Sequence, residues 1–282
     1  MDPGSVEPRS RSLFSDIVGR PDDAVDLAEA SLLIACEEYP GLDLPSYLSR
    51  LDAMGEHLRS RVPPGSAPDE VIAIVNRFLF EEEGFHGNAR DYYNPRNSFL
   101  NDVLDRRTGI PITLSTVYME VATRAGFSLV GVGLPGHFIV KAAIDGREIL
   151  VDPFNRGAVL SAGECQKRVD RVFKGRVKVE QRMLAGCSRK EILARMLHNL
   201  KLIYARSHDL GRTLGVLELL LRVQPDSVED VRDRGLVYAG LDCYGLAARD
   251  LEEYLARVPG ASEAAELRDT IAQMRHRASR VN

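Results

Sequence analysis

A histidine and an aspartate in the middle of the chain have the residue types and spacing of an acid–base pair. His137 follows Gly136 and opens an apolar run, and Asp152 closes the next apolar run after an Asp145-Gly146 turn. Asp-Gly between two such runs predicts a β-hairpin, which would bring the two side chains together. A carboxylate bonded to Nδ1 fixes the histidine tautomer and leaves Nε2 free as a base. The pair therefore predicts acyl-transfer chemistry, provided that a nucleophile faces the ring.

The cysteines are the first candidates for that nucleophile. They stand at positions 36, 165, 187 and 243 without a CxxC pair, so we expect free thiols in a reducing compartment. Cys36 alone precedes His137, on the apolar face of a predicted helix, where a small buried thiol is ordinary. We interpret the other three as structural. Since no HExxH motif or cysteine pair accompanies His137 and Asp152, we expect neither a metal site nor a cofactor.

Residues 84–97 form a predicted loop with many groups able to bind a ligand. The candidate binding residues are His86, Asn88, Tyr92, Tyr93, Asn94 and Asn97. Loops with such side chains often line sites. Asparagine and aspartate also stabilise turns through their own side chains, so a purely structural role is an equal alternative.

Hydrophobic periodicity predicts helices first and a small sheet afterwards. Apolar residues recur at helical spacing over residues 22–39, 44–62 and 69–82, and further helices are expected over about 98–106 and 111–125. Pro111 suits the first turn of the last helix, and Gly126 suits its C-terminal cap. Strands are expected at about 128–133, 137–144 and 147–152. This order predicts an α+β fold with a small antiparallel sheet.

From residue 189 onward the pattern is helical and repeats every 34 residues. Pairs with that spacing are Pro225 and Pro259, Tyr204 and Tyr238, Leu217 and Leu251, and Leu221 and Leu255. A period of 34 is typical of tetratricopeptide repeats. We predict two units, 194–227 and 228–261, followed by a capping helix over 262–277.

Composition and charge narrow the functional classes. The 282 residues are 44% apolar and 28% charged, as in globular proteins with an ample core. A net charge of −4 gives no general attraction to nucleic acid or membrane. No apolar run is long enough for a membrane span, and the polar first residues do not resemble a signal peptide, so we expect a cytoplasmic protein. Residues 167–182 hold seven Lys or Arg against two acids, which favours a solvated face over a phosphate or acidic-partner site.

Several long motifs resemble a known bacterial family. They are Phe78-Leu-Phe-Glu-Glu-Glu-Gly-Phe85, Asn94-Pro-Arg-Asn-Ser-Phe-Leu100, Arg107-Thr-Gly-Ile-Pro-Ile-Thr-Leu-Ser115, Pro135-Gly-His-Phe138 and Val151-Asp-Pro-Phe154. Together they resemble the SirB-type invasion-regulator family, whose members have a transglutaminase-like N-terminal domain and a tetratricopeptide C-terminal part. The resemblance implies a papain-like α+β core. It divides the chain into a mobile tail (1–19), a transglutaminase-like domain (20–160), a basic connector (161–188) and the repeats (189–277).

The resemblance also implies where a catalytic thiol should stand. Active transglutaminase-like enzymes carry a cysteine at the N-terminus of the helix before the sheet, which here falls near Ile112 or Thr113. No cysteine is present there. His137 and Asp152 match the other two catalytic positions. Thr113 is the nearest hydroxyl, with Ser115 behind it, but a hydroxyl is a poorer nucleophile than a thiolate, and Thr113 has the alternative role of capping the first turn.

Two functions follow from these observations. The first is a non-catalytic binding, scaffold or regulatory protein that recognises a peptide or protein partner through its cleft or its repeats. The second is an amide hydrolase or acyl transferase that uses His137, Asp152 and a hydroxyl or displaced thiol. The sequence leaves the partner and the oligomeric state open.

Overall fold

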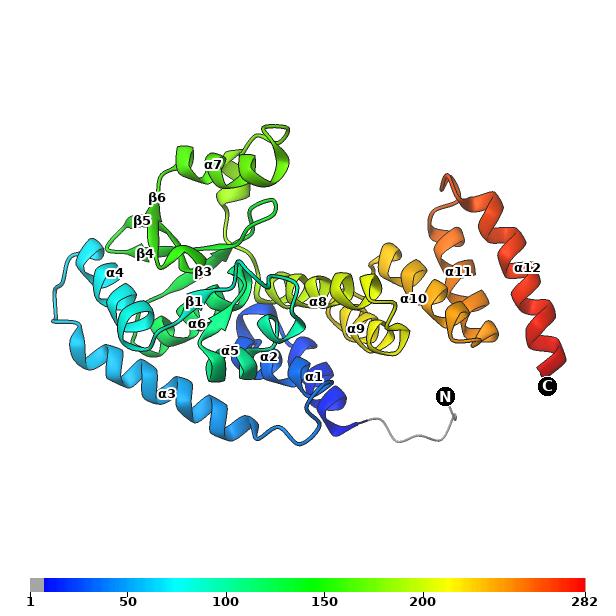
Figure 1. Ribbon diagram of the computed structural model, residues 1–282, viewed down its shortest axis with the longest axis horizontal. Helices are drawn as coiled ribbons and strands as arrows, with labels where there is room; N and C mark the ends of the chain where they lie inside the picture. The colour runs from blue at the N-terminus through cyan, green and yellow to red at the C-terminus, as the bar shows by residue number, and fades with distance from the viewer. Residues whose placement is uncertain (1–7, 282) are drawn as a thin grey trace. The chain divides into compact units, whose positions relative to one another are not determined.

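The computed structural model describes residues 8–281, with side chains for residues 8–278 (Figure 1). The chain divides into two compact units, which meet in sequence between Met196 and Leu197. The first unit combines helices with small sheets and the second is helical, so the predicted α+β class is confirmed. Within the described residues, no helix combines the length and the apolar character needed to cross a membrane.

Within residues 8–128, which the structure describes, six α-helices precede the main sheet of the first unit. They are α1 (Arg9–Val18), α2 (Leu27–Ala35), α3 (Leu44–Arg61), α4 (Pro68–Asn76, continued by π-helical turns over Arg77–Glu82), α5 (Leu100–Arg106) and α6 (Pro111–Arg124). Aspartates 26 and 43 cap α2 and α3 by accepting bonds from Glu29 N and Ser46 N. The predicted helices over 44–62, 69–82 and 111–125 are confirmed, whereas the predicted helix over 22–39 is shorter and follows a 3₁₀ turn.

The prediction of a mobile tail over residues 1–19 is wrong for Arg9–Val18, which form helix α1. Its residues Phe14, Ile17 and Val18 are buried against the rest of the unit, with α2 as a neighbour. Burial of these three apolar side chains, which lie on one side of the helix, holds α1 against the unit. The part of the predicted tail at residues 1–7 lies outside the described residues.

The main sheet is antiparallel with the strand order β3-β4-β5-β6. Its strands are β3 (Leu129–Val132), β4 (Ile139–Ile144), β5 (Arg147–Asp152) and β6 (Ala158–Leu160). The predicted hairpin is β4–β5, in which Val140 pairs with Val151. Its two-residue turn has positive φ at Asp145 (48°) and Gly146 (77°), as a type I′ turn requires. Strand β6 and the short parallel pair β1 (His86–Gly87) and β2 (Thr108–Gly109) were not predicted.

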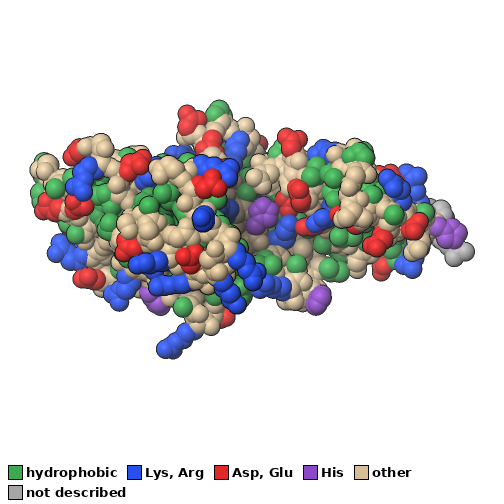
Figure 2. Space-filling model, turned by 90° about the horizontal axis from the view of Figure 1, so that it is seen from above, with side chains coloured by type: hydrophobic (Ala, Val, Ile, Leu, Met, Phe, Trp, Pro, Cys, Tyr) green, Lys and Arg blue, Asp and Glu red, His purple; other side chains and the backbone are tan. Residues whose placement is uncertain are grey.

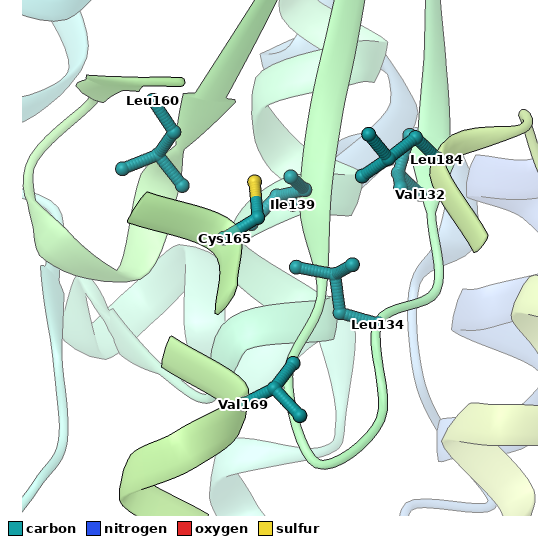
Figure 3. Packing of buried hydrophobic residues seen from close by; sticks show 7 residues of the cluster. All are labelled: Val132, Leu134, Ile139, Leu160, Cys165, Val169 and Leu184. Atoms are coloured by element: carbon teal, nitrogen blue, oxygen red, sulfur yellow. The ribbon is translucent and has the colours of Figure 1, made fainter. Parts of the chain in front are cut away.

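Helix α7 (Ala162–Phe173) packs on one face of this sheet. Figure 3 shows Cys165 and Val169 on α7 beside Ile139 and Leu134, while Val132 lies next to Leu184 in the same cluster. Ser161 begins the helix, because its hydroxyl accepts from Glu164 N while the Glu164 carboxylate accepts from Ser161 N. The segment 161–188, expected as a basic connector, is therefore part of the first unit. Its two fully buried residues on α7 give too weak a pattern to be recognised among charged neighbours.

The second unit has the expected repeat. It contains the C-terminal part of α8 (Arg189–Arg206), then α9 (Leu210–Val223), α10 (Val228–Gly240), α11 (Tyr244–Arg257) and α12 (Ala264–Val281). The turns within the two helix pairs are alike, with left-handed backbone at His208 (φ 56°) and Asp242 (φ 59°). Leu217 and Leu251, 34 residues apart, are both fully buried. The helices thus confirm the repeat and its final helix.

Charged side chains of both signs are interspersed over the face seen in Figure 2. Several ion pairs join neighbouring helices within the second unit. Lys201 on α8 contacts Asp230 on α10 at 2.7 Å, and Arg234 on α10 contacts Asp250 on α11 at 2.6 Å. Both aspartates are buried, and the first pair joins the two predicted repeats while the second joins the two helices of one repeat.

Candidate functional site

The structure brings His137 and Asp152 together. The His137 Nε2 atom lies 3.0 Å from Asp152 Oδ1, the aspartate side chain is fully buried, and the histidine side chain is 11% exposed. Nε2 makes no hydrogen bond of acceptable angle among the described residues, so the contact is a close approach of the ring to the carboxylate and not an aligned hydrogen bond. The prediction that Asp152 would contact Nδ1 and leave Nε2 free is wrong, because Nε2 is the nitrogen that faces the carboxylate.

Strand register explains which nitrogen faces the aspartate. Strand β4 begins at Ile139, two residues after His137, and β5 ends at Asp152, one position beyond the Val140–Val151 pair. The imidazole must therefore reach diagonally along the ladder to meet the carboxylate. Nε2 lies farther from the backbone than Nδ1, so it makes the contact.

Asp152 has two further partners. Arg168 on α7 places its Nε atom 2.9 Å from Asp152 Oδ2, and Asn155 donates from Nδ2 to the same oxygen at 2.7 Å. Burial raises the pKa of the carboxyl group, but the close contacts with His137, Asn155 and Arg168 outweigh it, and the pKa lies below its usual value. Asp152 is therefore an anion shared by a histidine, an amide and a guanidinium.

Arg168 is the site residue that sequence reasoning missed. It belongs to the basic stretch 167–182, which was interpreted as a solvated face. The other six basic residues of that stretch are exposed, as predicted, but the Arg168 side chain is only 18% exposed. A usable signal was its place next to Val169 and one turn after Cys165, which puts it at the edge of the buried stripe of α7.

The N-terminus of α6 carries Thr113 where the thiol of an active enzyme is expected. Thr113 is fully buried. Its Oγ1 atom accepts from Ile110 N at 3.1 Å and donates to Asn97 O at 2.7 Å. The single hydroxyl proton is thus directed at a backbone carbonyl and not at an imidazole. This geometry supports the capping role for Thr113 and contradicts the role of nucleophile. Ser115 Oγ, one residue beyond Leu114, is buried without a hydrogen-bond partner in the described residues.

The thiols are poorly suited to replace the missing nucleophile. Burial raises the pKa of Cys36, of Cys165 and of Cys187, and the charge of Asp152 adds to the effect at Cys165. Cys165 is fully buried in the apolar cluster between α7 and the sheet (Figure 3). None of the four cysteines, all of which the structure describes, is hydrogen-bonded to His137. The structural interpretation of these thiols agrees with their surroundings.

The aromatic side chains of the 84–97 loop reach the neighbourhood of His137. The Phe154 ring meets the His137 ring edge-on at 6.1 Å between centroids, and Tyr92 meets Phe154 at 6.3 Å. Tyr93 packs on Tyr92 at 5.3 Å and is 56% exposed. We call Tyr92, Tyr93, Phe154 and His137 the aromatic cluster. Two of the six predicted binding residues belong to it.

The other four candidate binding residues hold the loop in place. Asn97 is fully buried, donates to Asp91 O and Tyr92 O, and accepts from Asn88 Nδ2. The side chain of Asn94 accepts from Arg96 N, and His86 contacts the Gly84 carbonyl and the Thr108 hydroxyl. These bonds remain within the loop and β2, so the turn-forming interpretation fits all four. Among the described residues, no group of three or more ligand-type side chains could hold a metal ion.

A central helix, a hairpin with a His–Asp pair and a following helical repeat define a transglutaminase-like domain joined to tetratricopeptide repeats. Residues 45–198 match the model of the Transglutaminase-like superfamily, and residues 200–275 match that of the Tetratricopeptide repeat. A UPF0162 protein of Xylella fastidiosa is 38% identical over 257 residues, which cover 90% of this chain and 92% of that protein. The chain therefore belongs to the UPF0162 family of the transglutaminase-like superfamily.

The chain is also similar to more distantly related proteins. A UPF0162 protein of Vibrio cholerae is 29% identical over 201 residues, covering 71% of this chain and 74% of that protein. F-box only protein 21 of Mus musculus is 33% identical over 177 residues, covering 57% of this chain and 26% of that protein. A crystal structure of menin has a TM-score of 0.40 at 12% identity, covering 86% of this chain and 68% of menin, a likeness too weak to support an argument.

Proposed function

We propose that this protein is a non-catalytic member of the transglutaminase-like superfamily that recognises a peptide or protein partner as a scaffold or regulator. The observation that carries the proposal is the occupancy of the α6 N-terminus. Thr113 stands there, buried, with its hydroxyl bonded to Ile110 N and Asn97 O. A nucleophile must be accessible and must be able to give its proton to a base, and Thr113 meets neither condition.

The partners of Asp152 support the same proposal. In acyl-transfer enzymes the carboxylate stabilises the imidazolium that forms when histidine takes a proton. Here Arg168 and Asn155 already bind this carboxylate. A guanidinium beside the anion neutralises much of the field that would stabilise a protonated ring. Asp152 is thus engaged in holding α7 to β5 as well as in facing His137.

Binding of a peptide or protein partner is the activity that the fold of the two units supports. Tetratricopeptide repeats generally bind proteins through stacked helices. The aromatic cluster adds one exposed ring, Tyr93, and tyrosine is among the side chains that contribute most to protein interfaces. A cytoplasmic location and the SirB-type assignment stay predictions that accompany this proposal.

The test compares catalysis with binding in the full-length protein. We expect no hydrolysis of fluorogenic amide substrates above the uncatalysed rate, and no labelling of Thr113, Ser115 or a cysteine by an electrophilic peptide probe. Hydrolysis that disappears in His137→Ala would overturn the proposal in favour of the amide hydrolase or acyl transferase.

The binding arm uses capture of partners from a lysate of the source cells. Immobilised wild-type protein should retain a defined partner that Tyr92→Ala retains less well. Val159→Ala changes an exposed residue on β6 outside the aromatic cluster and is the matched control. Equal capture by all three proteins would remove the aromatic cluster from the proposal.

A further inference from the structure

A second cavity lies apart from the His137–Asp152 pair within the first unit. Its volume is about 800 Å³, and its walls come from the connection between α2 and α3, the beginning of α3, residue Arg96 and helix α5. Neither His137 nor Asp152 lines it. We call it the α5 pocket. It includes part of the Asn94–Leu100 motif, which the proposed function leaves unexplained.

Two similar polar triads stand in the wall of the α5 pocket. In the first, Tyr39 donates its hydroxyl to Asp102 Oδ2 at 2.6 Å, and Arg96 donates from Nε to Asp102 Oδ1 at 2.7 Å. In the second, Tyr47 donates to Asp105 Oδ2 at 2.8 Å, and Arg50 donates to Asp105 Oδ1 at 2.8 Å.

The two triads present aromatic and acidic groups together. Residues 102 and 105 lie three apart on α5, so their carboxylates share one helix face. Each tyrosine is held by its hydroxyl, which fixes the ring beside a carboxylate. An ordered ring next to an anion is a favourable surrounding for an organic cation, through both charge and cation–π attraction.

Asn101, the residue before Asp102 on α5, supplies an independent sign of a ligand. It lines the α5 pocket, is only 5% exposed, and its Oδ1 atom has no hydrogen-bond partner in the described residues. A buried amide oxygen without a partner is destabilising, because water has been removed and nothing has replaced it. The oxygen lacks an N–H or O–H donor, which a ligand in the pocket can supply after a small shift of the amide.

The net charge of the α5 pocket indicates which charge the donor group of the ligand should carry. Its walls carry four carboxylates and two guanidinium groups, an excess of negative charge. A positively charged donor is therefore favoured over a neutral or anionic one. A metal ion is a poor candidate, since no group of three or more ligand-type side chains among the described residues is placed to hold one. The remaining class is an organic cation with N–H donors.

We propose that the α5 pocket binds a lysine or arginine side chain of a peptide segment, with Asn101 Oδ1 and the Asp105 carboxylate as acceptors and the rings of Tyr39 and Tyr47 against the cation. An extended peptide with one basic side chain fits a cavity of this size and openness to solvent. The proposal is independent of whether the His137 site is catalytic, because the two sites share no residue.

The test measures binding of a fluorescein-labelled Gly-Arg-Gly-Arg-Gly peptide to the full-length protein by fluorescence anisotropy at low ionic strength. The matched anionic probe is Gly-Glu-Gly-Glu-Gly. Asn101→Leu removes the amide while keeping the branched shape and the number of side-chain heavy atoms, and because the buried Oδ1 atom has no partner in the described residues, the variant should fold as well as wild type. Asp105→Asn removes one charge from the α5 pocket. Asp69→Asn removes one charge from an exposed residue elsewhere and is the control.

We expect saturable binding of the arginine probe, no saturable binding of the glutamate probe, and at least a tenfold loss of affinity in both Asn101→Leu and Asp105→Asn, with Asp69→Asn unchanged. Circular dichroism at the assay temperature must show all variants folded. The proposal is overturned if folded Asn101→Leu binds as tightly as wild type, or if Asp69→Asn weakens binding as much as Asp105→Asn. It is also overturned if the arginine probe does not saturate.

Discussion

Replacing Arg168 with methionine tests whether the His137–Asp152 pair depends on helix α7. Methionine keeps most of the aliphatic stem that packs at the edge of α7, but it removes the guanidinium. The Asp152 carboxylate, which is fully buried, then keeps only the Asn155 bonds and the His137 contact. The substitution therefore leaves a partly compensated anion inside the protein.

The expected loss of unfolding free energy in Arg168→Met is large for the substitution of a single polar residue. Removing one partner of a buried ion pair costs about 3–5 kcal/mol. Because Asn155 still donates to Asp152 and the Arg168 side chain is 18% exposed, we expect about 3 kcal/mol of unfolding free energy to be lost. Arg171→Met, an exposed change on the same helix, should cost less than about 0.5 kcal/mol.

The pH dependence of stability gives a second, independent readout. The pKa of Asp152 in the folded protein lies below the ordinary value of 3.8. A carboxyl group with a lowered folded pKa contributes stability that is present above its unfolded pKa and is lost as pH falls through the folded pKa. Wild type should therefore lose this contribution below about pH 4. Arg168→Met should lose less on acidification, because its Asp152 pKa is less depressed.

Urea unfolding followed by circular dichroism at neutral pH and in an acid series measures both quantities. Hydrogen exchange of residues 139–152 assigns the loss to the hairpin and distinguishes it from unfolding of the repeats. The reasoning is refuted if Arg168→Met is no less stable than Arg171→Met and the two acid profiles are parallel. In that case the guanidinium–carboxylate contact would be worth no more than a solvated surface pair.

Other parts of the first unit yield further predictions. Thr113→Val should lower the unfolding free energy by about 2 kcal/mol, measured by urea unfolding, because it leaves Ile110 N and Asn97 O without a partner. Gly157→Ala should cost at least about 2 kcal/mol in the same assay, since Gly157 has φ +74° and an added Cβ would lie 2.0 Å from Asn76 Oδ1. In the folded protein, Cys36 and Cys165 should stay unmodified by a thiol reagent that labels both in urea, read by mass spectrometry; rapid native labelling of Cys165 would contradict its buried position.

Local signals in the sequence predicted much of the fold. Helical spacing located α3 and α6, Pro111 and Gly126 marked the ends of α6, and Asp145-Gly146 marked the β4–β5 turn. The 34-residue period predicted the helix pairs of the second unit, because each pair repeats the same packing with its neighbour. These features depend on residues close in sequence or on an internal repeat.

Tertiary contacts account for what the sequence did not predict. Helix α7 is mostly polar, and only its contact with the sheet shows that Cys165 and Val169 form a buried stripe. The Arg168–Asp152 contact joins residues 16 apart through that packing. The pairing of His137 with Asp152 could be predicted from the hairpin. The choice of Nε2 could not, since it depends on the diagonal offset between the strands.

In active transglutaminase-like enzymes, catalytic groups stand at the positions of Thr113 and Asp152. In this protein, each of these two residues binds a segment that lies outside its own helix or strand. At the end of α6, Thr113 ties the 84–97 loop to the helix through Asn97 O. At the end of β5, Asp152 ties α7 to the sheet through Arg168. Both bonds are buried, so their loss would be costly even in a protein without catalysis. The buried Asp152 therefore has a structural role through Arg168 that does not depend on catalysis, and a catalytic role for His137 would require an accessible nucleophile beside its ring.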